Sequence, residues 1–73
     1  MKALIEIECK NPERVIKSIE PDMENNGKFD VKLEEHDGKI FLKIEAPEIS
    51  GVLAALNSYL RLIKTAMEVD DIA

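Results

Sequence analysis

The sequence predicts an α+β domain: a two-layer βαββα fold with a three-stranded antiparallel sheet (order 1-3-2) and two helices on one face. The segments 3–9, 29–36 and 39–46 alternate apolar and polar side chains, which is the period of a strand with one buried face. The dipeptide Asp37-Gly38 separates the last two segments and is typical of a hairpin turn. The segments 12–20 and 47–70 instead repeat their apolar residues with the period of a helix.

The first strand and the first helix follow each other closely. The inward face of the strand consists of Ala3, Ile5, Ile7 and Cys9. Asn11 and Pro12 predict the start of a helix, because asparagine is a favoured N-cap and proline is favoured at the first helical position. The apolar stripe of this helix consists of Val15, Ile16 and Ile19. The helix ends before Pro21, and the polar residues 21–27 are expected to form a loop.

Counting back from the Asp37-Gly38 turn sets the register of the hairpin. Its apolar face receives three pairs: Leu33 with Leu42, Val31 with Ile44, and Phe29 with Ala46. A slip of one residue would exchange the two faces, so the register is well specified. The first helix returns the chain to the end of the sheet where it began. The first two strands therefore run parallel, with the third strand between them.

Size and charge limit the classes of function. The chain of 73 residues forms one domain, 1–73, and a chain this short buries only about 60% of its unfolded surface, so association is a common remedy. Its net charge of −5 argues against a protein that binds nucleic acid alone, because phosphate contacts need basic residues. The first residues mix charged with apolar side chains and predict neither a signal peptide nor a membrane span. With a single cysteine, a cytoplasmic location is expected.

The long helix at 47–70 has two apolar stripes. The first contains Ile49, Leu53, Leu56, Leu60, Ile63 and Met67. The second contains Val52, Ala55, Tyr59, Leu62, Ala66 and Val69, and it lies about 110° around the helix from the first. We expect the sheet to cover one stripe and the short first helix to cover part of the other, which leaves apolar surface for a partner protein. The alternative is that both stripes belong to the core.

The second stripe is the predicted docking surface. The candidate partner-binding residues are Val52, Ala55, Tyr59, Leu62 and Ala66, flanked by Asn57 and Arg61, with Val15 and Ile16 from the first helix. Asn57 is included because asparagine is a poor helix former, so its side chain either makes a specific hydrogen bond to a partner or is simply tolerated at this position. On the outward face of the sheet, Leu4 and Phe41 are either isolated surface residues or contacts for a partner or a second copy.

The sequence offers little for catalysis or for a cofactor. Its one histidine, His36, lies beside the hairpin turn, and Cys9 points toward the core at the end of a strand. No cysteine and histidine spacing suits zinc, and the three glycines form no phosphate-binding loop. We therefore predict no catalytic residue, no cofactor and no metal site.

Residues 50–69, SGVLAALNSYLRLIKTAMEV, resemble the long C-terminal helix of the Pcc-type subunit of KEOPS, a tRNA-modification complex. The matching segments are Ala54-Ala55-Leu56-Asn57-Ser58, Leu60-Arg61 and Glu68-Val69. The segment Ser18-Ile19-Glu20-Pro21-Asp22 is similar to the end of the family's first helix. Family members often have an arginine just before the alanine pair, where this chain has Leu53. This difference leaves room for a diverged paralogue.

The resemblance implies a non-catalytic assembly subunit. Family members dimerise, with themselves or with a paralogue, and hold two copies of the tRNA threonylcarbamoyl-transferase subunit by pairing their helices with two of its helices in a four-helix bundle. The complex installs threonylcarbamoyl-adenosine in tRNA, so this chain would meet tRNA only within the complex.

The alternative function is a stand-alone RNA-binding domain of KH-like or ferredoxin-like shape. Its phosphate contacts would come from Lys28, Lys32, Lys39 and Lys43. The chain lacks the Gly-x-x-Gly loop and the pair of stacking aromatic residues that such domains use.

Overall fold

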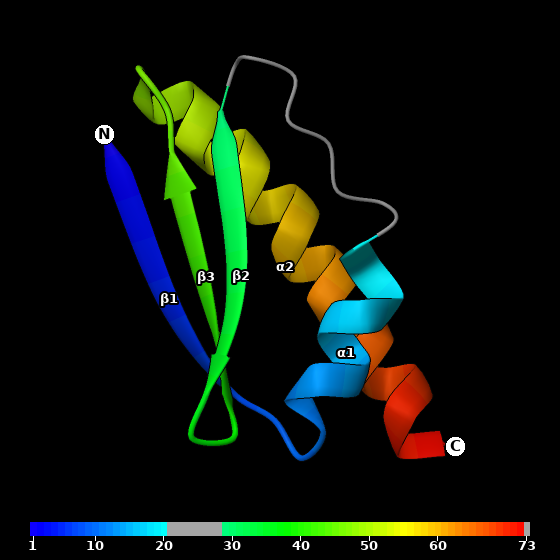
Figure 1. Ribbon diagram of the computed structural model, residues 1–73. Coiled ribbons are helices and arrows are strands. Elements are labelled where there is room, and N and C mark those ends of the chain that lie inside the picture. Colours follow the sequence, from blue (N-terminus) through cyan, green and yellow to red (C-terminus); the bar gives the residue numbers. More distant parts are fainter. Residues whose placement is uncertain (21–28, 73) are drawn as a thin grey trace.

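The computed structural model describes residues 1–20 and 29–72. The elements are β1 (Lys2–Glu8), α1 (Pro12–Ile19), β2 (Asp30–His36), β3 (Lys39–Glu45) and α2 (Ile49–Ile72). The strands form an antiparallel sheet in the order β1-β3-β2, and both helices pack against one face of it (Figure 1). The predicted α+β class, element order and sheet order are confirmed. The loop expected at 21–27 lies outside the described residues.

The β2–β3 hairpin has the predicted register. Leu33 lies opposite Leu42 and Val31 lies opposite Ile44. Asp37 and Gly38 have φ angles of 54° and 74°, and two successive positive φ angles are the signature of a type I′ turn. The twist of this turn matches the twist of the strands. The turn therefore sets the register that places the apolar residues of both strands on the face toward the helices.

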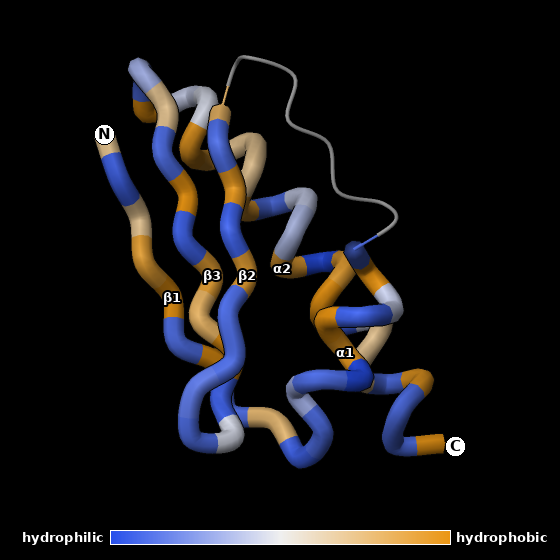
Figure 2. The backbone as a smooth tube through the Cα atoms, viewed as in Figure 1, coloured by the Kyte–Doolittle hydropathy of each residue, from blue (hydrophilic) through white to orange (hydrophobic). Residues whose placement is uncertain are grey.

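The core is aliphatic and lies between the sheet and the helices. Ile40, Leu42 and Ile44 of β3 are at most 2% exposed. Figure 2 shows that polar and apolar segments follow each other along this strand, and Lys43 and Glu45 flank the buried Ile44. From α2, the buried residues are Val52, Ala55, Tyr59 and Ile63. From α1, they are Pro12, Val15, Ile16 and Ile19. The central strand thus supplies the most deeply buried side chains, and both helices pack over it.

Asp70 ties the ends of the two helices together. Asn11 occupies the predicted N-cap position of α1, but its side chain does not cap the helix. Its amide Nδ2 donates to Asp70 Oδ2 at 2.8 Å instead, and Arg14 Nε lies 3.2 Å from Asp70 Oδ1. The Asp70 side chain is only 10% exposed. Because both of its oxygens are bound, this carboxylate holds the end of α2 against the start of α1.

The contacts of Asp70 give a testable stability difference. We expect Asp70→Ala to lower the free energy of unfolding by about 1 to 2 kcal/mol, because two contacts to a mostly buried charge are lost. The matched control is Asp71→Ala, since this neighbouring carboxylate is exposed. Urea denaturation of the three proteins measures the effect. Equal midpoints for the two variants would contradict this role of Asp70.

The outward face of the sheet carries ion pairs between its charged side chains. Glu34 accepts a hydrogen bond from Lys43 Nζ at 3.0 Å and lies 2.9 Å from His36 Nε2. Lys39 Nζ lies 2.9 Å from Glu6. The hydrogen bonds from His36 and Lys43 lower the pKa of the Glu34 carboxyl below its usual 4.5. Two glutamates of this face are thus paired with basic groups, whereas Lys32 lies opposite Lys43 and Asp30 lies opposite Glu45.

The lowered pKa of Glu34 predicts a dependence of stability on pH. A carboxyl whose pKa is lower in the folded state stabilises the protein above about pH 4.5, and this contribution is lost as the pH falls through the folded-state pKa. We therefore expect Glu34→Gln to lose less stability than the wild type on acidification. Urea denaturation at a series of pH values tests this, with Glu45→Gln as control. Parallel profiles for the wild type and Glu34→Gln would contradict it.

Candidate docking groove between the helices

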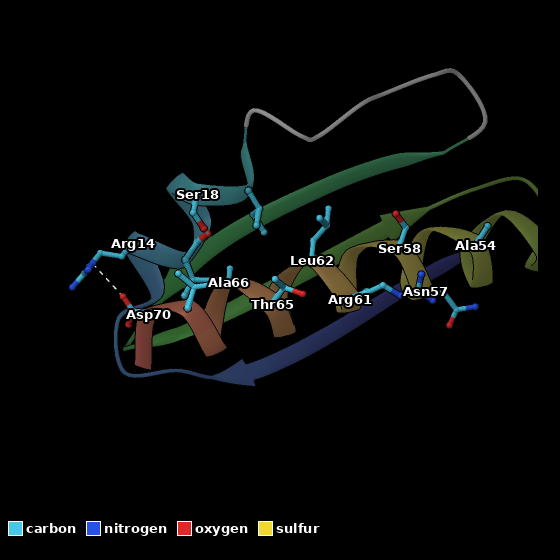
Figure 3. A pocket seen from close by; sticks show the side chains of 13 residues that line it. Arg14, Ser18, Ala54, Asn57, Ser58, Arg61, Leu62, Thr65, Ala66 and Asp70 are labelled. Carbon is cyan, nitrogen blue, oxygen red and sulfur yellow. Dashed lines mark hydrogen bonds and ion pairs between the residues drawn. The ribbon is translucent and has the colours of Figure 1, made fainter. Parts of the chain in front are cut away.

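A groove of about 1070 Å³ runs along the surface between α1 and α2. Figure 3 shows Arg14 and Asp70 at one end of the groove and Ala54 and Asn57 toward the other, with Leu62 between them. Ser58, Thr65 and Ala66 lie along the same side of α2. The groove therefore follows α2 for most of its length and has α1 as its second wall at one end.

The difference in length between the two helices produces this groove. α1 has 8 residues and α2 has 24, which correspond to about 12 Å and 36 Å of helix. α1 therefore covers only part of one flank of α2. Along the rest of this flank the side chains of Ala54 and Ser58 are small, so a further helix can approach within the usual 8 to 10 Å between helix axes.

The charge in the groove is concentrated at Arg61. Arg14, the other arginine of the groove, already contacts Asp70. Arg61 is exposed and makes no ion pair within residues 1–20 and 29–72. Its neighbours Ser58 and Leu62 provide a hydroxyl group and an apolar side chain. The surface therefore suits a helix with an apolar stripe and a carboxylate at the position opposite Arg61.

Five of the nine predicted partner-binding residues line this groove. They are Val15, Asn57, Arg61, Leu62 and Ala66. Asn57, Arg61 and Leu62 are exposed or half-buried. Four of the five come from α2, and Val15, which is only 1% exposed, comes from α1. The structure thus brings together the predicted residues in the middle and C-terminal part of α2 and one predicted residue of α1.

Val15 and the other four predicted residues are in the core, which corrects the expected exposure of the second stripe. Val15, Ile16, Val52, Ala55 and Tyr59 are 1%, 9%, 5%, 1% and 3% exposed. The ring of Tyr59 also packs edge-on against Phe29, with centroids 6.4 Å apart. The reason is the rotation of α2: the line facing the sheet runs between the two stripes, from Val52 to Ile63. Each stripe therefore leaves only its outer edge exposed.

The sequence prediction missed several lining residues of the groove. They are Arg14, Ser18, Ile19, Ala54, Ser58, Thr65, Val69 and Asp70. For α2, the sequence does contain a pattern that indicates these lining residues. Positions 54, 58, 62, 65 and 69 have spacings of 4, 4, 3 and 4, so their side chains follow one flank of a helix. Three of these residues are small or hydroxylated, and hydropathy alone did not select them.

Among the described residues, no three His, Cys, Asp or Glu side chains gather as a metal site would require. In the same part of the chain, no helix is long and apolar enough to cross a membrane.

A protein-family model described as transcription factor Pcc1 matches residues 2–71 of this chain. The match covers all three strands and nearly all of α2, as well as α1. No curated protein matches the chain significantly.

Proposed function

Because the chain belongs to the Pcc1 family, which is the family of the Pcc1 subunit of KEOPS, we propose that it is a non-catalytic assembly subunit of that complex. In this proposal the chain dimerises and docks the tRNA threonylcarbamoyl-transferase subunit through α1 and α2. Family membership implies a place in a multi-subunit complex of the KEOPS type, and the family is one of small accessory subunits.

The groove between α1 and α2 is the observation that supports docking. A pair of helices from the transferase would lie along it and complete a four-helix bundle, in which neighbouring axes are 8 to 10 Å apart. Ala54 and Ser58 leave room for the backbone of such a helix, and Leu62 offers apolar surface in the middle of the groove. Arg61 at its rim would meet a carboxylate of the transferase.

The alternative of a stand-alone RNA-binding domain has less support. Lys39 and Lys43 are each within 3.0 Å of a glutamate, so their charges are partly neutralised. Lys32 lies opposite Lys43 on the same face, and Lys28 lies outside the described residues. A salt-sensitive affinity of the isolated chain for tRNA would be the result that favours this alternative.

Light scattering on the purified protein, alone and mixed with the transferase subunit, tests the proposal. We expect a dimer alone and a stoichiometric complex in the mixture. A monomer that does not bind the transferase would contradict both parts of the proposal. A dimer that does not bind would contradict docking alone.

A further inference from the structure

We infer that the outward face of the sheet binds the same face of a second copy, with the two sheets stacked and their strands antiparallel about a two-fold axis across the middle of the sheet. This outer sheet surface consists of every second residue of each strand: from Lys2 to Glu8 in β1, from Asp30 to His36 in β2 and from Lys39 to Glu45 in β3. The contact is additional to the dimer of the proposed function.

No described element covers the outer sheet surface. Both helices pack against the opposite face of the sheet (Figure 1). Leu4 is 63% exposed although it lies in a strand. Phe41 is half-buried, and its ring packs edge-on against His36 with centroids 5.6 Å apart. An apolar spot therefore lies open to water among the charged side chains of this face.

Two pairs of like charges lie directly opposite each other at one end of this surface. Lys32 is opposite Lys43, and Asp30 is opposite Glu45. Like charges in opposite positions destabilise a pair of strands. Of these four side chains, only Lys43 has an ion pair among residues 1–20 and 29–72, with Glu34 at 3.0 Å. A partner with the complementary charges would offset the cost of this arrangement.

The charges at the two ends of the surface are opposite in sign on every strand. The opposed ends are Lys2 and Glu8 of β1, Glu45 and Lys39 of β3, and Asp30 and His36 of β2. A two-fold axis across the middle of the sheet places each end of one copy over the other end of the second copy. Each of these acidic side chains then faces a basic one, with His36 in its protonated form facing Asp30. The surface is therefore complementary to itself.

The middle of the surface supplies an apolar centre. Leu4 and Phe41 lie in neighbouring rows of outward residues, and the axis passes between these two rows. Leu4 faces Glu6 of the second copy and adjoins its Phe41, so four apolar side chains gather at the axis. Beside them, Lys32 of each copy faces Glu34 of the other. An apolar centre with a polar rim is the usual anatomy of a protein interface.

Other two-fold arrangements bring like charges together. An axis along β3 would place Glu45, Lys43 and Lys39 each over its own copy. An axis moved by one residue toward the start of β2 would place Lys32 and Lys43 over their own copies. An axis moved by one residue the other way would place Glu34 over its own copy. The axis between these two rows is the most favourable of the four, and the contact is isologous and closes after two copies.

The size of the surface determines the strength of the contact. Three strands of 7 residues each span about 14 Å by 24 Å, so the buried area falls below the roughly 1,200 to 2,000 Å² of stable interfaces. Exposed ion pairs contribute little each and are screened by salt. We therefore expect a weak, salt-sensitive association. The docking groove lies in the helical layer, on the other side of the sheet, and stays accessible.

Charge reversal beside the axis tests this contact. Stacked sheets cross at about 30°, and this rotation displaces pairs near the axis least, so Lys32 and Glu34 are the pair to change. We expect Lys32→Glu and Glu34→Lys each to weaken the association about tenfold or more, because each creates two pairs of like charges between the copies. An equal mixture of the two variants should associate within about threefold of the wild type, since every glutamate then faces a lysine.

Two features of the chain control for indirect effects. Lys32→Glu removes the like-charge pair with Lys43 within the sheet, so it should not destabilise the monomer, and circular dichroism checks this. Lys17→Glu has the same charge change on the exposed side of α1, outside the groove, and should associate like the wild type. Lys32→Glu should also bind the transferase subunit as the wild type does.

Sedimentation equilibrium at about 0.05 M and 0.5 M salt measures the association. The step that Lys32→Glu weakens runs from dimer to tetramer when the dimer of the proposed function forms, and from monomer to dimer when it does not. The two can therefore fail separately. A wild type without this step up to about 1 mM protein would overturn the inference, as would a step that is insensitive to Lys32→Glu. A mixture of the two variants that associates no better than each alone would overturn the arrangement about this axis.

Discussion

Ala55→Glu is expected to unfold the protein. Ala55 is 1% exposed and belongs to the core beneath the sheet, with Val52 and Tyr59. A glutamate would place a charged group and extra volume in a closely packed apolar site, which costs several kcal/mol. At about 0.05 to 0.15 kcal/mol per residue, a domain of this size has roughly 4 to 11 kcal/mol of stability in total. This single change therefore removes much or all of it.

Ala54→Glu is the matched control for this prediction. The two alanines are neighbours in the sequence, but Ala54 is exposed in the groove. We expect Ala54→Glu to keep the wild-type stability within about 1 kcal/mol. Circular dichroism with thermal unfolding compares the two variants. If Ala55→Glu melts like the wild type, then Ala55 is not a core residue and the observed rotation of α2 is wrong.

The hairpin was predictable because its signals are local. Two residues, Asp37 and Gly38, determine the turn, and the alternation on either side determines which face is buried. The order of the strands then follows from the short connections between elements. For these features, residues close in the sequence contain the necessary information.

The rotation of α2 was not predictable in the same way. Apolar residues cover more than half of its circumference, so several rotations would bury a similar area. The choice depends on how the side chains fit together in the core, where Tyr59 and the small Ala55 are buried together with Ile63. Packing of this kind involves three elements at once. Asn11 is a second example, because its side chain binds Asp70, 59 positions away, instead of its own helix.

Leu62→Glu is expected to abolish binding of the transferase subunit without unfolding the protein. Leu62 is half-buried and points into the groove, beside Ser58 and Ala66 (Figure 3). In the free protein the glutamate can turn its carboxylate toward water, so the fold is retained. Under a docked helix the carboxylate would be desolvated against apolar side chains. A cost of about 3 to 5 kcal/mol corresponds to a loss of affinity of roughly 150-fold or more.

Leu60→Gln is the control for this effect. Leu60 lies on the flank of α2 away from the groove, so we expect this variant to bind the transferase with nearly wild-type affinity per subunit. Leu62→Glu should remain a dimer and bind no transferase. Titration calorimetry with each variant gives affinity and stoichiometry together. If Leu62→Glu binds the transferase as the wild type does, then the groove is not the docking site. If Leu60→Gln is the variant that loses binding, then docking requires the flank of α2 that lies outside the groove.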